Sequence, residues 1–361
     1  MSSLEIRPLE PSDARAVYDL LAEPAVSRAL DGTSLDSPHA FVERFVASAE
    51  QPGVDRLGAF EDDELAGVLE IGRSSRVRAH HAGQLLLAVA GRRQRRGVGE
   101  ALLAAGLDAA DRWLHLVRLD VEVLASARGA HRLFARHGFA PEVRRRAAIA
   151  VDGALADTVL FGRLRPGFTQ PEGCLRAAPP LPPRASSAPG TLVFRAADPS
   201  DAAALSRFSR DPSVLFGSSQ VPTNSAAYWR RRLTAWAGAG AYTMVAEVDG
   251  EVIGCGNLNV SDVVRRRHTA ILGLSVIAPY QGMGIGDRMM TELVAHAEER
   301  LACERIELCV YADNARAIRL YEKYGFVREG VARCDAWRDG GYADSLVMAR
   351  LAPRRLADPS D

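Results

Sequence analysis

The chain has few cysteines, no long apolar run and no excess of charge of one sign. Only five of its 361 residues are cysteine, an odd number without a CxxC pair, which argues against a disulfide framework and a zinc site. No apolar run reaches bilayer-spanning length, and the first residues lack the apolar stretch of a signal peptide. Basic and acidic residues number 45 each, so no overall field favours nucleic acid or membranes. These absences predict a cytoplasmic protein without metal, nucleic acid or membrane partners.

The sequence repeats itself at an offset of 187 residues. The segment QRRGVG at 94–99 returns as QGMGIG at 281–286, so that Gly97 matches Gly284 (284 − 97 = 187). The same offset relates Arg118 to Arg305, Gly138 to Gly325 and Arg163 to Arg350. Near the N-terminus the offset is 188, as for Arg7 and Arg195 (195 − 7), so one residue is gained or lost between about 27 and 58. A register kept over most of each copy indicates a duplication.

The repeat predicts two domains, 1–165 and 191–352, with a linker at 166–190 and a tail at 353–361. The linker is rich in proline and has no apolar periodicity, which is typical of a semi-extended spacer. Each copy has a short strand, helices, a β-hairpin, an apolar strand, a helix, a strand, a helix and a closing pair of strands. In the second copy the hairpin carries Asp249-Gly250, a strong two-residue turn signal. These elements predict an α+β domain on a mixed sheet.

A glycine-rich segment joins a strand to a helix in each copy. In the second copy Gln281, Gly284 and Gly286 follow an apolar strand and precede a helix. Glycines allow a tight turn that points several N–H groups at one place, and the positive end of the helix dipole adds to anion binding there. The spacing differs from the GxGxxG dinucleotide motif and from a P-loop. The pattern favours a phosphate-binding turn over a turn that serves only the fold.

Two longer motifs carry a family resemblance. VIAPYQGMGIG at 276–286 resembles the acetyl-CoA signature of the GNAT superfamily of N-acetyltransferases, and NARAIRLYEKYGF at 314–326 resembles its second signature. The resemblance covers nearly all of 191–352 and, more weakly, 3–165. It implies two tandem GNAT domains with the acyl-CoA N-acyltransferase fold, an α+β fold on a mixed α/β sheet. It also implies an N-acetyltransferase that takes acetyl-CoA as co-substrate and needs no metal.

The resemblance assigns roles to residues of the second copy. Backbone groups of Leu274 and Val276 would pair with the pantetheine arm as an added strand does. A β-bulge usual in the family would splay this strand from its neighbour and leave an amide for the thioester oxygen. Tyr321 is the expected catalytic residue, which protonates the departing thiolate. The expected coenzyme-binding residues are Leu274, Val276, Gln281, Gly282, Met283, Gly284, Ile285, Gly286, Asn314 and Tyr324.

Each of these roles has a structural alternative. Tyr321 can be an amphipathic residue at a helix–sheet seam, although its motif favours catalysis. Tyr324 can serve aromatic packing beside Gly325. Asn314 can cap the helix that it begins, which is compatible with a contact to the coenzyme.

The sequence leaves the general base unassigned. No aspartate or glutamate stands in the strand before Gln281, where many relatives hold a base. His268 can assist deprotonation of the amine through water, but a hydrogen-bonded histidine at a strand edge is the favoured interpretation. Asn257 and Asn259 share one strand face, where they either line an acceptor pocket or solvate the sheet. A water chain is the remaining route for the proton.

The two copies differ where the chemistry is expected. Tyr321 corresponds to Phe134, Asn314 to Ala127 and Tyr324 to His137. The first copy keeps Gln94, Gly97 and Gly99 of the glycine segment. Because phenylalanine has no proton to give a thiolate, we expect the first copy to be catalytically weak or inert. Its role is then that of a scaffold, an interface or a second coenzyme site.

Beyond the superfamily signatures, the second copy resembles the bacterial L-amino-acid N-acetyltransferases. RRRH at 265–268, RIEL at 305–308 and the stretch 339–350 carry this resemblance. It implies a small-molecule amine as the acceptor, such as an amino acid or short peptide, although Ile271 stands where that branch is expected to hold an acidic residue. The alternatives are a mycothiol-synthase-like, aminoglycoside or protein N-terminal acetyltransferase, or a non-catalytic CoA-binding sensor. A homodimer is compatible with the sequence.

Overall fold

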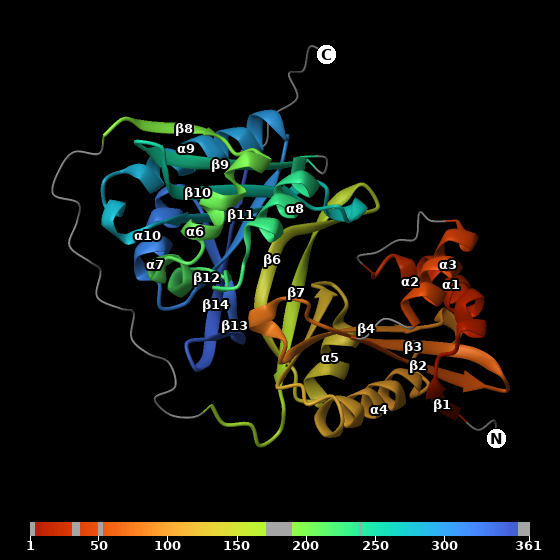
Figure 1. Ribbon diagram of the computed structural model, residues 1–361. Coiled ribbons are helices and arrows are strands. Elements are labelled where there is room, and N and C mark those ends of the chain that lie inside the picture. Colours follow the sequence, from red (N-terminus) through yellow and green to blue (C-terminus); the bar gives the residue numbers. More distant parts are fainter. Residues whose placement is uncertain (1–3, 31–36, 50–52, 171–189, 238–239, 353–361) are drawn as a thin grey trace, which may run out of the picture. The chain divides into compact units, whose positions relative to one another are not determined.

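The computed structural model describes residues 4–30, 37–49, 53–170, 190–237 and 240–352, and the chain divides into two compact units, 1–170 and 171–361 (Figure 1). The boundary falls inside the predicted linker, of which 171–189 lie outside the described residues, as does the predicted tail at 353–361. Each unit contains its own core of apolar side chains.

Within the described residues, each unit has a mixed sheet of seven strands. The first unit has the order β1-β2-β3-β4-β5-β7-β6, with β1 (Leu4–Pro8), β2 (Val54–Glu61), β3 (Glu64–Arg73), β4 (Ala82–Val89), β5 (Arg118–Leu124), β6 (Ala140–Val151) and β7 (Ala154–Leu164). The second has the order β8-β9-β10-β11-β12-β14-β13, with β8 (Leu192–Ala196), β9 (Ala241–Val248), β10 (Glu251–Val260), β11 (Thr269–Val276), β12 (Arg305–Tyr311), β13 (Val327–Arg338) and β14 (Gly341–Leu351). The pairs β4–β5 and β11–β12 are parallel and the other pairs within each unit are antiparallel. The predicted mixed-sheet α+β fold is confirmed.

Helices cover both faces of each sheet. The first unit has α1 (Ala14–Ala22), α2 (Pro24–Ser27), α3 (Pro38–Ala49), α4 (Val98–Arg112) and α5 (Arg128–Arg136). The second has α6 (Ala202–Phe208), α7 (Pro212–Gly217), α8 (Ala226–Ala237), α9 (Ile285–Ala295) and α10 (Ala315–Lys323). In the second unit α9 and α10 pack on one face around Leu293, and α6 and α8 pack on the other around Trp229. We call the side of the second sheet that α9 and α10 cover the α9 face, and the side that α6 and α8 cover the α8 face. In the first unit the corresponding sides are the α4 face and the α3 face, each named after the helix that packs on it.

The predicted hairpin of the second unit is confirmed. Asp249 and Gly250 join β9 to β10 with φ angles of 50° and 85°. Two successive positive φ values match the right-handed twist of the flanking strands, which is why this dipeptide favours a two-residue turn.

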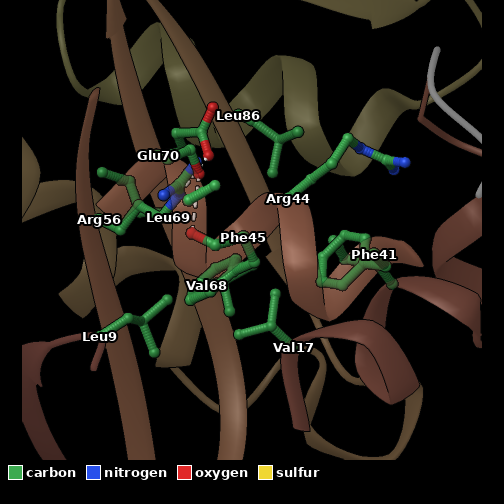
Figure 2. A pocket seen from close by; sticks show the side chains of 13 residues that line it. Leu9, Val17, Phe41, Arg44, Phe45, Arg56, Val68, Leu69, Glu70 and Leu86 are labelled. Carbon is green, nitrogen blue, oxygen red and sulfur yellow. Dashed lines mark hydrogen bonds and ion pairs between the residues drawn. The ribbon is translucent and has the colours of Figure 1, made fainter. Parts of the chain in front are cut away.

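The α3 face of the first sheet is hollowed. Between α1, α3 and strands β2 to β4 lies a cavity of about 480 Å³ with mostly apolar walls. Figure 2 shows Phe41, Phe45 and Val68 along it, and an ion pair of 2.7 Å between Arg56 and Glu70. Arg56 and Glu70 are cross-strand partners in β2 and β3. The ion pair therefore lies on the sheet that forms one wall of the cavity.

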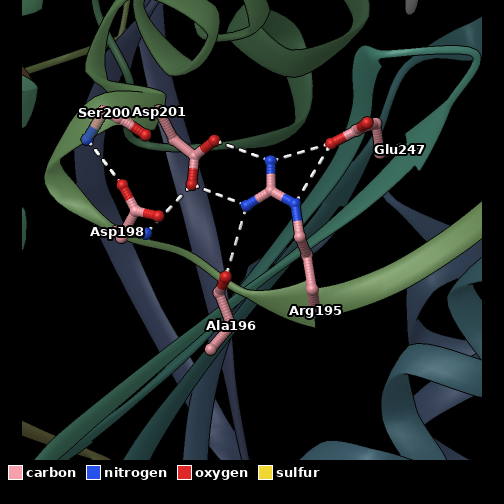
Figure 3. A network of polar contacts seen from close by, with 6 residues as sticks. All are labelled: Arg195, Ala196, Asp198, Ser200, Asp201 and Glu247. Carbon is pink, nitrogen blue, oxygen red and sulfur yellow. Dashed lines mark hydrogen bonds and ion pairs between the residues drawn. The ribbon is translucent and has the colours of Figure 1, made fainter.

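Matching ion pairs occupy the same places in both units. In the second unit Arg195 donates to Asp201 through both Nη atoms at 2.8 Å and to Glu247 at 2.7 Å (Figure 3). In the first unit Arg7 donates to Asp13 at 2.8 and 3.0 Å. Other matched pairs are Arg163–Asp111 with Arg350–Glu298, and Arg118–Glu142 with Arg305–Glu329. The sequence offsets thus relate residues with the same contacts, and two tandem domains of one fold are confirmed.

Candidate active site

Strands β11 and β12 part to leave an opening in the second sheet. They pair in parallel at three residues of β11, Thr269 to Ile271, and separate beyond them. From there β11 continues to Val276 beside β10, and β12 continues to Tyr311 beside β14. The two backbone edges that face the opening, which include Leu274, pair with no other strand of the described residues there. An extended ligand can pair with such an edge as an added strand does.

The opening does not arise from the bulge that the resemblance implies. β10 and β11 keep one register from the pair Val260–Ala270 to the pair Gly254–Val276. The register shift in this region lies between β9 and β10, at Val252 and Gly254. The expected bulge in β11 is therefore wrong. The strands part because β12 stays paired with β14 along its whole length while β11 stays with β10.

The glycine segment after β11 forms a cradle of backbone N–H groups. Gly282 and Gly284 both have a φ of 81°, in the region that favours glycine, and α9 begins at Ile285. Within the described residues, the amides of 282–286 have no acceptor, as expected at the start of a helix. A Cβ built on Gly284 would meet no atom within 4 Å, so space is open beside the turn. Free amides, open space and the helix dipole fit a diphosphate.

Gln281 shapes this turn from within. Its Nε2 donates to the Val276 carbonyl at 2.7 Å, and its Oε1 accepts from Arg316 at 3.0 Å. In the first unit Gln94 donates to the Val89 carbonyl in the same way, at 3.1 Å. One polar end of Gln281 therefore closes the turn, and the other joins the turn to α10. A direct contact between Gln281 and a coenzyme remains a prediction, and these hydrogen bonds do not support it.

The first unit keeps the same turn. Gly97 has a φ of 88°, and a Cβ there would also meet no atom within 4 Å. Arg95 stands at the position of Gly282 and holds a φ of 59°, which costs a non-glycine residue about 1 kcal/mol or more. Strands β4 and β5 likewise pair at three residues and then part. The backbone arrangement for anion binding is therefore present in both units.

Tyr321 of α10 lies in the core cluster that also contains residues of β11, β12 and α9. The residue is 6% exposed, and its hydroxyl has no hydrogen-bond partner in the part of the chain that the structure describes. Burial raises the pKa of the Tyr321 hydroxyl to about 12, so the group stays protonated and able to donate. Without a partner in the described residues, the Tyr321 hydroxyl is free to donate to a ligand. Phe134 at this position in the first unit has no hydroxyl.

Tyr324 has partners inside the protein. Its hydroxyl donates to the Asp287 carbonyl at 2.6 Å and lies 2.8 Å from Thr291 Oγ1, so it fastens α10 to α9. In the first unit His137 contacts Glu100 at the corresponding place, at 2.9 Å. These contacts support the packing alternative, and a coenzyme contact from Tyr324 gains no support.

Asn314 caps α10, as the sequence predicts. Its Oδ1 accepts from the Ala317 amide at 3.2 Å. Its side-chain NH₂ group donates to no acceptor in the described residues. The cap thus leaves donors free, and the coenzyme contact expected of Asn314 remains a prediction.

His268 lies at the closed end of β11. It precedes Thr269, and its carbonyl accepts from the Glu304 and Arg305 amides at 2.9 and 3.1 Å. The opening begins beyond Ile271, so about 10 Å of strand separates His268 from it. This position supports the strand-edge interpretation, and the general base remains unassigned.

A buried arginine near the end of β12 belongs to none of the motifs recognised in the sequence. Arg338 of β13 is 2% exposed, and its Nη1 donates to Asp313 at 3.0 Å. Its guanidinium lies 4.3 Å from the ring centre of Phe216 and 4.5 Å from that of Tyr311. Its Nε is buried without a partner in the described residues. Val151 stands at this place in the first copy, so a comparison of the copies is the signal that marks Arg338.

Known proteins match both units. The model described as the acetyltransferase (GNAT) family matches residues 15–139 and 209–326. The chain belongs to the GNAT family of acetyltransferases. This GNAT protein is 36% identical over 160 residues to the L-amino acid N-acetyltransferase AaaT of Escherichia coli (strain K12), a match that covers 44% of this chain and 98% of that protein. It is therefore an acyltransferase.

Other relatives of the GNAT chain match shorter parts or only in outline. The spermine/spermidine N(1)-acetyltransferase of Bacillus subtilis (strain 168) is 43% identical over 51 residues, 14% of this chain and 34% of that protein. The crystal structure of a GNAT acetyltransferase from Streptococcus pneumoniae has 26% identity and a TM-score of 0.42, and covers 45% of this chain and 100% of that one. Among the described helices, none has the length and hydrophobicity needed to cross a bilayer.

Proposed function

We propose that the second unit transfers an acetyl group from acetyl-CoA to the primary amine of an amino acid or another small molecule, by direct attack of the amine. Three features of this unit support the proposal: the opening between β11 and β12, the N–H cradle at the start of α9, and the unpaired Tyr321 hydroxyl. The first unit has the opening and the cradle but carries Phe134. The Tyr321 hydroxyl is the observation on which the choice of unit rests.

The residues present suit the coenzyme. The amides of 282–286 would hold the diphosphate, and the free edge of β11 at Leu274 and Val276 would pair with the pantetheine arm. The unused NH₂ group of Asn314 is a further donor at the start of α10. Bound acetyl-CoA supplies an activated thioester carbonyl.

The protein's main contribution is to hold the amine and the thioester together, because a thioester is already reactive. The amine nitrogen bonds to the carbonyl carbon, the carbon–sulfur bond breaks, the nitrogen gives up one proton and the sulfur takes one. The Tyr321 hydroxyl donates to the sulfur. Burial that raises the pKa of Tyr321 also makes a thiolate beside it more basic, so a proton can pass between them. The proton from the amine leaves through water, and water returns a proton to the Tyr321 oxygen.

Two observations favour an amino acid as the acceptor. The match to an L-amino acid N-acetyltransferase covers nearly all of that relative. The buried Nε of Arg338, which has no partner in the described residues, is a charge-assisted donor suited to a carboxylate.

A panel of amines tests the proposal. Amino acids, dipeptides, polyamines and aminoglycosides are each incubated with the full-length protein and acetyl-CoA, and free thiol and acetylated product are measured. We expect thiol release above the amine-free rate with an amino acid or a similar small amine. Acetyl-CoA binding without transfer to any amine would favour the sensor alternative. A clear preference for an aminoglycoside or a peptide N-terminus would favour the corresponding enzyme.

A further inference from the structure

Three polar side chains lie on the α8 face, one on each of the strands β9, β10 and β11, of which β11 borders the opening. Thr243 of β9 is the cross-strand partner of Asn257 of β10, and Asn257 is the partner of Gly273 of β11. Cross-strand partners share a face of the sheet. Ser275 lies two residues beyond Gly273 and so points to the same face. The three side chains therefore lie on one side of the sheet, opposite the helix that begins at the N–H cradle.

These side chains have no partners in the described part of the chain. Thr243 is 8% exposed, and its Oγ1 is buried without a hydrogen bond. No hydrogen bond joins the side chains of Asn257 or Ser275 to another described residue. Asn257 and Ser275 are partly exposed, so of the three only the Thr243 hydroxyl is buried without a partner in the described residues. Native proteins pair nearly all of their buried polar groups, within the chain or with a ligand or water. The unpaired Thr243 hydroxyl, with two partly exposed polar side chains on the same face, favours a ligand at this place.

Gly273 makes room for Asn257 where the opening begins. A Cβ built on Gly273 would lie 2.6 Å from Asn257 Oδ1, so the amide covers the bare backbone of β11. The pairing of β11 with β12 ends two residues earlier, at Ile271. The coenzyme cradle lies on the α9 side, which leaves the α8 face for an acceptor amine. Asn257 lies on this face, beside the point where β11 leaves β12.

In the first unit the corresponding positions hold an ion pair and two apolar residues. Thr243, Asn257, Gly273 and Ser275 are replaced by Arg56, Glu70, Leu86 and Ala88. Arg56 and Glu70 form an ion pair, and with Leu86 they line the cavity of the α3 face (Figure 2). No neutral amide or hydroxyl remains at these four places, and Leu86 covers the backbone that Gly273 leaves bare. The unit without the phenol has therefore also lost this polar set.

We infer that Thr243, Asn257 and Ser275 bind the acceptor and select a small monoamine, bound with its amine group uncharged, over a polyamine. This inference rests on the proposed acetyl transfer. An uncharged amine donates its two N–H groups to Asn257 Oδ1 and Ser275 Oγ and turns its lone pair to the opening, while Thr243 bonds a second polar group of the acceptor.

The preference for a monoamine follows from the lack of charge at these three positions. A carboxylate beside the amine would stabilise the ammonium form, which has no lone pair for attack. None of the three positions holds a carboxylate. The Arg232 cation and the Asp201 carboxylate act on Cys255 of the same strand face. Arg195 already binds the carboxylates of Asp201 and Glu247. The distant ammonium groups of a polyamine would be desolvated near a cation and near carboxylates that Arg195 already binds, which is unfavourable.

Variants of Asn257 and Thr243 in the full-length protein test the inference. Asn257→Ala removes an acceptor for the amine and should raise the KM for the amine about tenfold, with the Kd for acetyl-CoA unchanged. Thr243→Val keeps the shape of the buried side chain and should raise the same KM by a smaller factor. Asn257→Asp should move the rising limb of kcat against pH about one unit to higher pH, because the new carboxylate raises the pKa of the bound amine.

Two matched controls belong to the experiment. Asn259→Ala changes the same residue type on the same strand face, but opposite Ile271, where β11 is still paired with β12. Glu70→Gln changes the counterpart of Asn257 in the first unit. Both variants should leave the amine KM and the pH profile as they are in the wild type.

The outcomes separate this inference from the function on which it rests. A wild type that acetylates a monoamine, with Asn257→Ala and Thr243→Val leaving its KM unchanged, would overturn the inference and leave the acetyl transfer standing. A higher kcat/KM for spermine than for every monoamine would overturn it as well. A wild type that binds acetyl-CoA and acetylates no amine would overturn the proposed function itself.

Discussion

Leu69 of β3 fills the space that Gly106 of α4 leaves, and a Cβ on Gly106 would lie 2.7 Å from Leu69 Cδ2. The second unit has the same contact with the sizes exchanged. Gly256 of β10 stands at the position of Leu69 and Leu293 of α9 at that of Gly106, and a Cβ on Gly256 would lie 2.8 Å from Leu293 Cδ1. The two copies thus preserve one helix–sheet packing with the leucine supplied from opposite partners.

Exchanging this pair in the first unit should be tolerated only when both residues change. Gly106→Leu alone adds a leucine to a filled space and should cost about 1–3 kcal/mol of unfolding free energy. Leu69→Gly alone leaves a void and should cost about 3–5 kcal/mol. The double variant recreates the arrangement of the second unit and should be at least about 1 kcal/mol more stable than the sum of the single effects. Urea unfolding of the full-length variants measures this coupling, and strictly additive effects would contradict a shared space.

Gly284→Val should weaken acetyl-CoA binding by the second unit more than tenfold. The new side chain would enter the open space before the α9 amides, at a backbone φ that disfavours it. Isothermal titration calorimetry of the full-length protein measures the affinity, and circular dichroism checks the fold. Gly97→Val is the matched change in the first unit, and a fall in stoichiometry with that variant would locate a second coenzyme there. Unaltered affinity in Gly284→Val would rule out the cradle as the diphosphate site.

The duplication explains why so much of the fold could be predicted from the sequence. Glycines and arginines matched at a fixed offset are the residues whose contacts recur, such as Arg195 with Asp201 and Arg7 with Asp13. The turn at Asp249-Gly250 and the helix start at Gly284 depend on local backbone preferences, which short motifs record.

The contacts that cross between elements were not predictable in the same way. The opening between β11 and β12 depends on which neighbour each strand keeps, and no single strand records this. Tyr324 and Gln281 stand in coenzyme motifs, yet both use their polar atoms inside the protein. The burial and the unpaired atoms of Thr243 and Arg338 cannot be seen in the sequence, although a comparison of the two copies marks Arg338 against Val151.

Tyr321→Phe should lower kcat roughly 10²-fold or more while leaving the Kd for acetyl-CoA unchanged, because a proton donor is removed and the ring is kept. Burial raises the pKa of this hydroxyl to about 12, so the wild-type rate should show no loss from its ionisation below about pH 11. Steady-state rates from thiol release between about pH 6 and 10 check both points. Phe134→Tyr in the first unit is the matched control and should leave the rate unchanged. A Tyr321→Phe enzyme as fast as the wild type would remove the phenol from the mechanism.

Asp201→Asn should destabilise the second unit at neutral pH and have little effect in acid. Hydrogen bonds from Arg195 hold the pKa of the Asp201 carboxyl below its usual value. The pair's stabilisation is therefore fully present above the ordinary carboxyl pKa of about 4 and is lost as the pH falls through the lowered pKa. The stability of the wild type should exceed that of Asp201→Asn by about 1–3 kcal/mol at pH 7, and this difference should shrink as the pH falls below about 4 and through the lowered pKa of Asp201. Urea unfolding over a pH series measures it, with Asp13→Asn as the counterpart in the first unit, and a difference that stays constant with pH would show that the Asp201 charge is not the stabilising group.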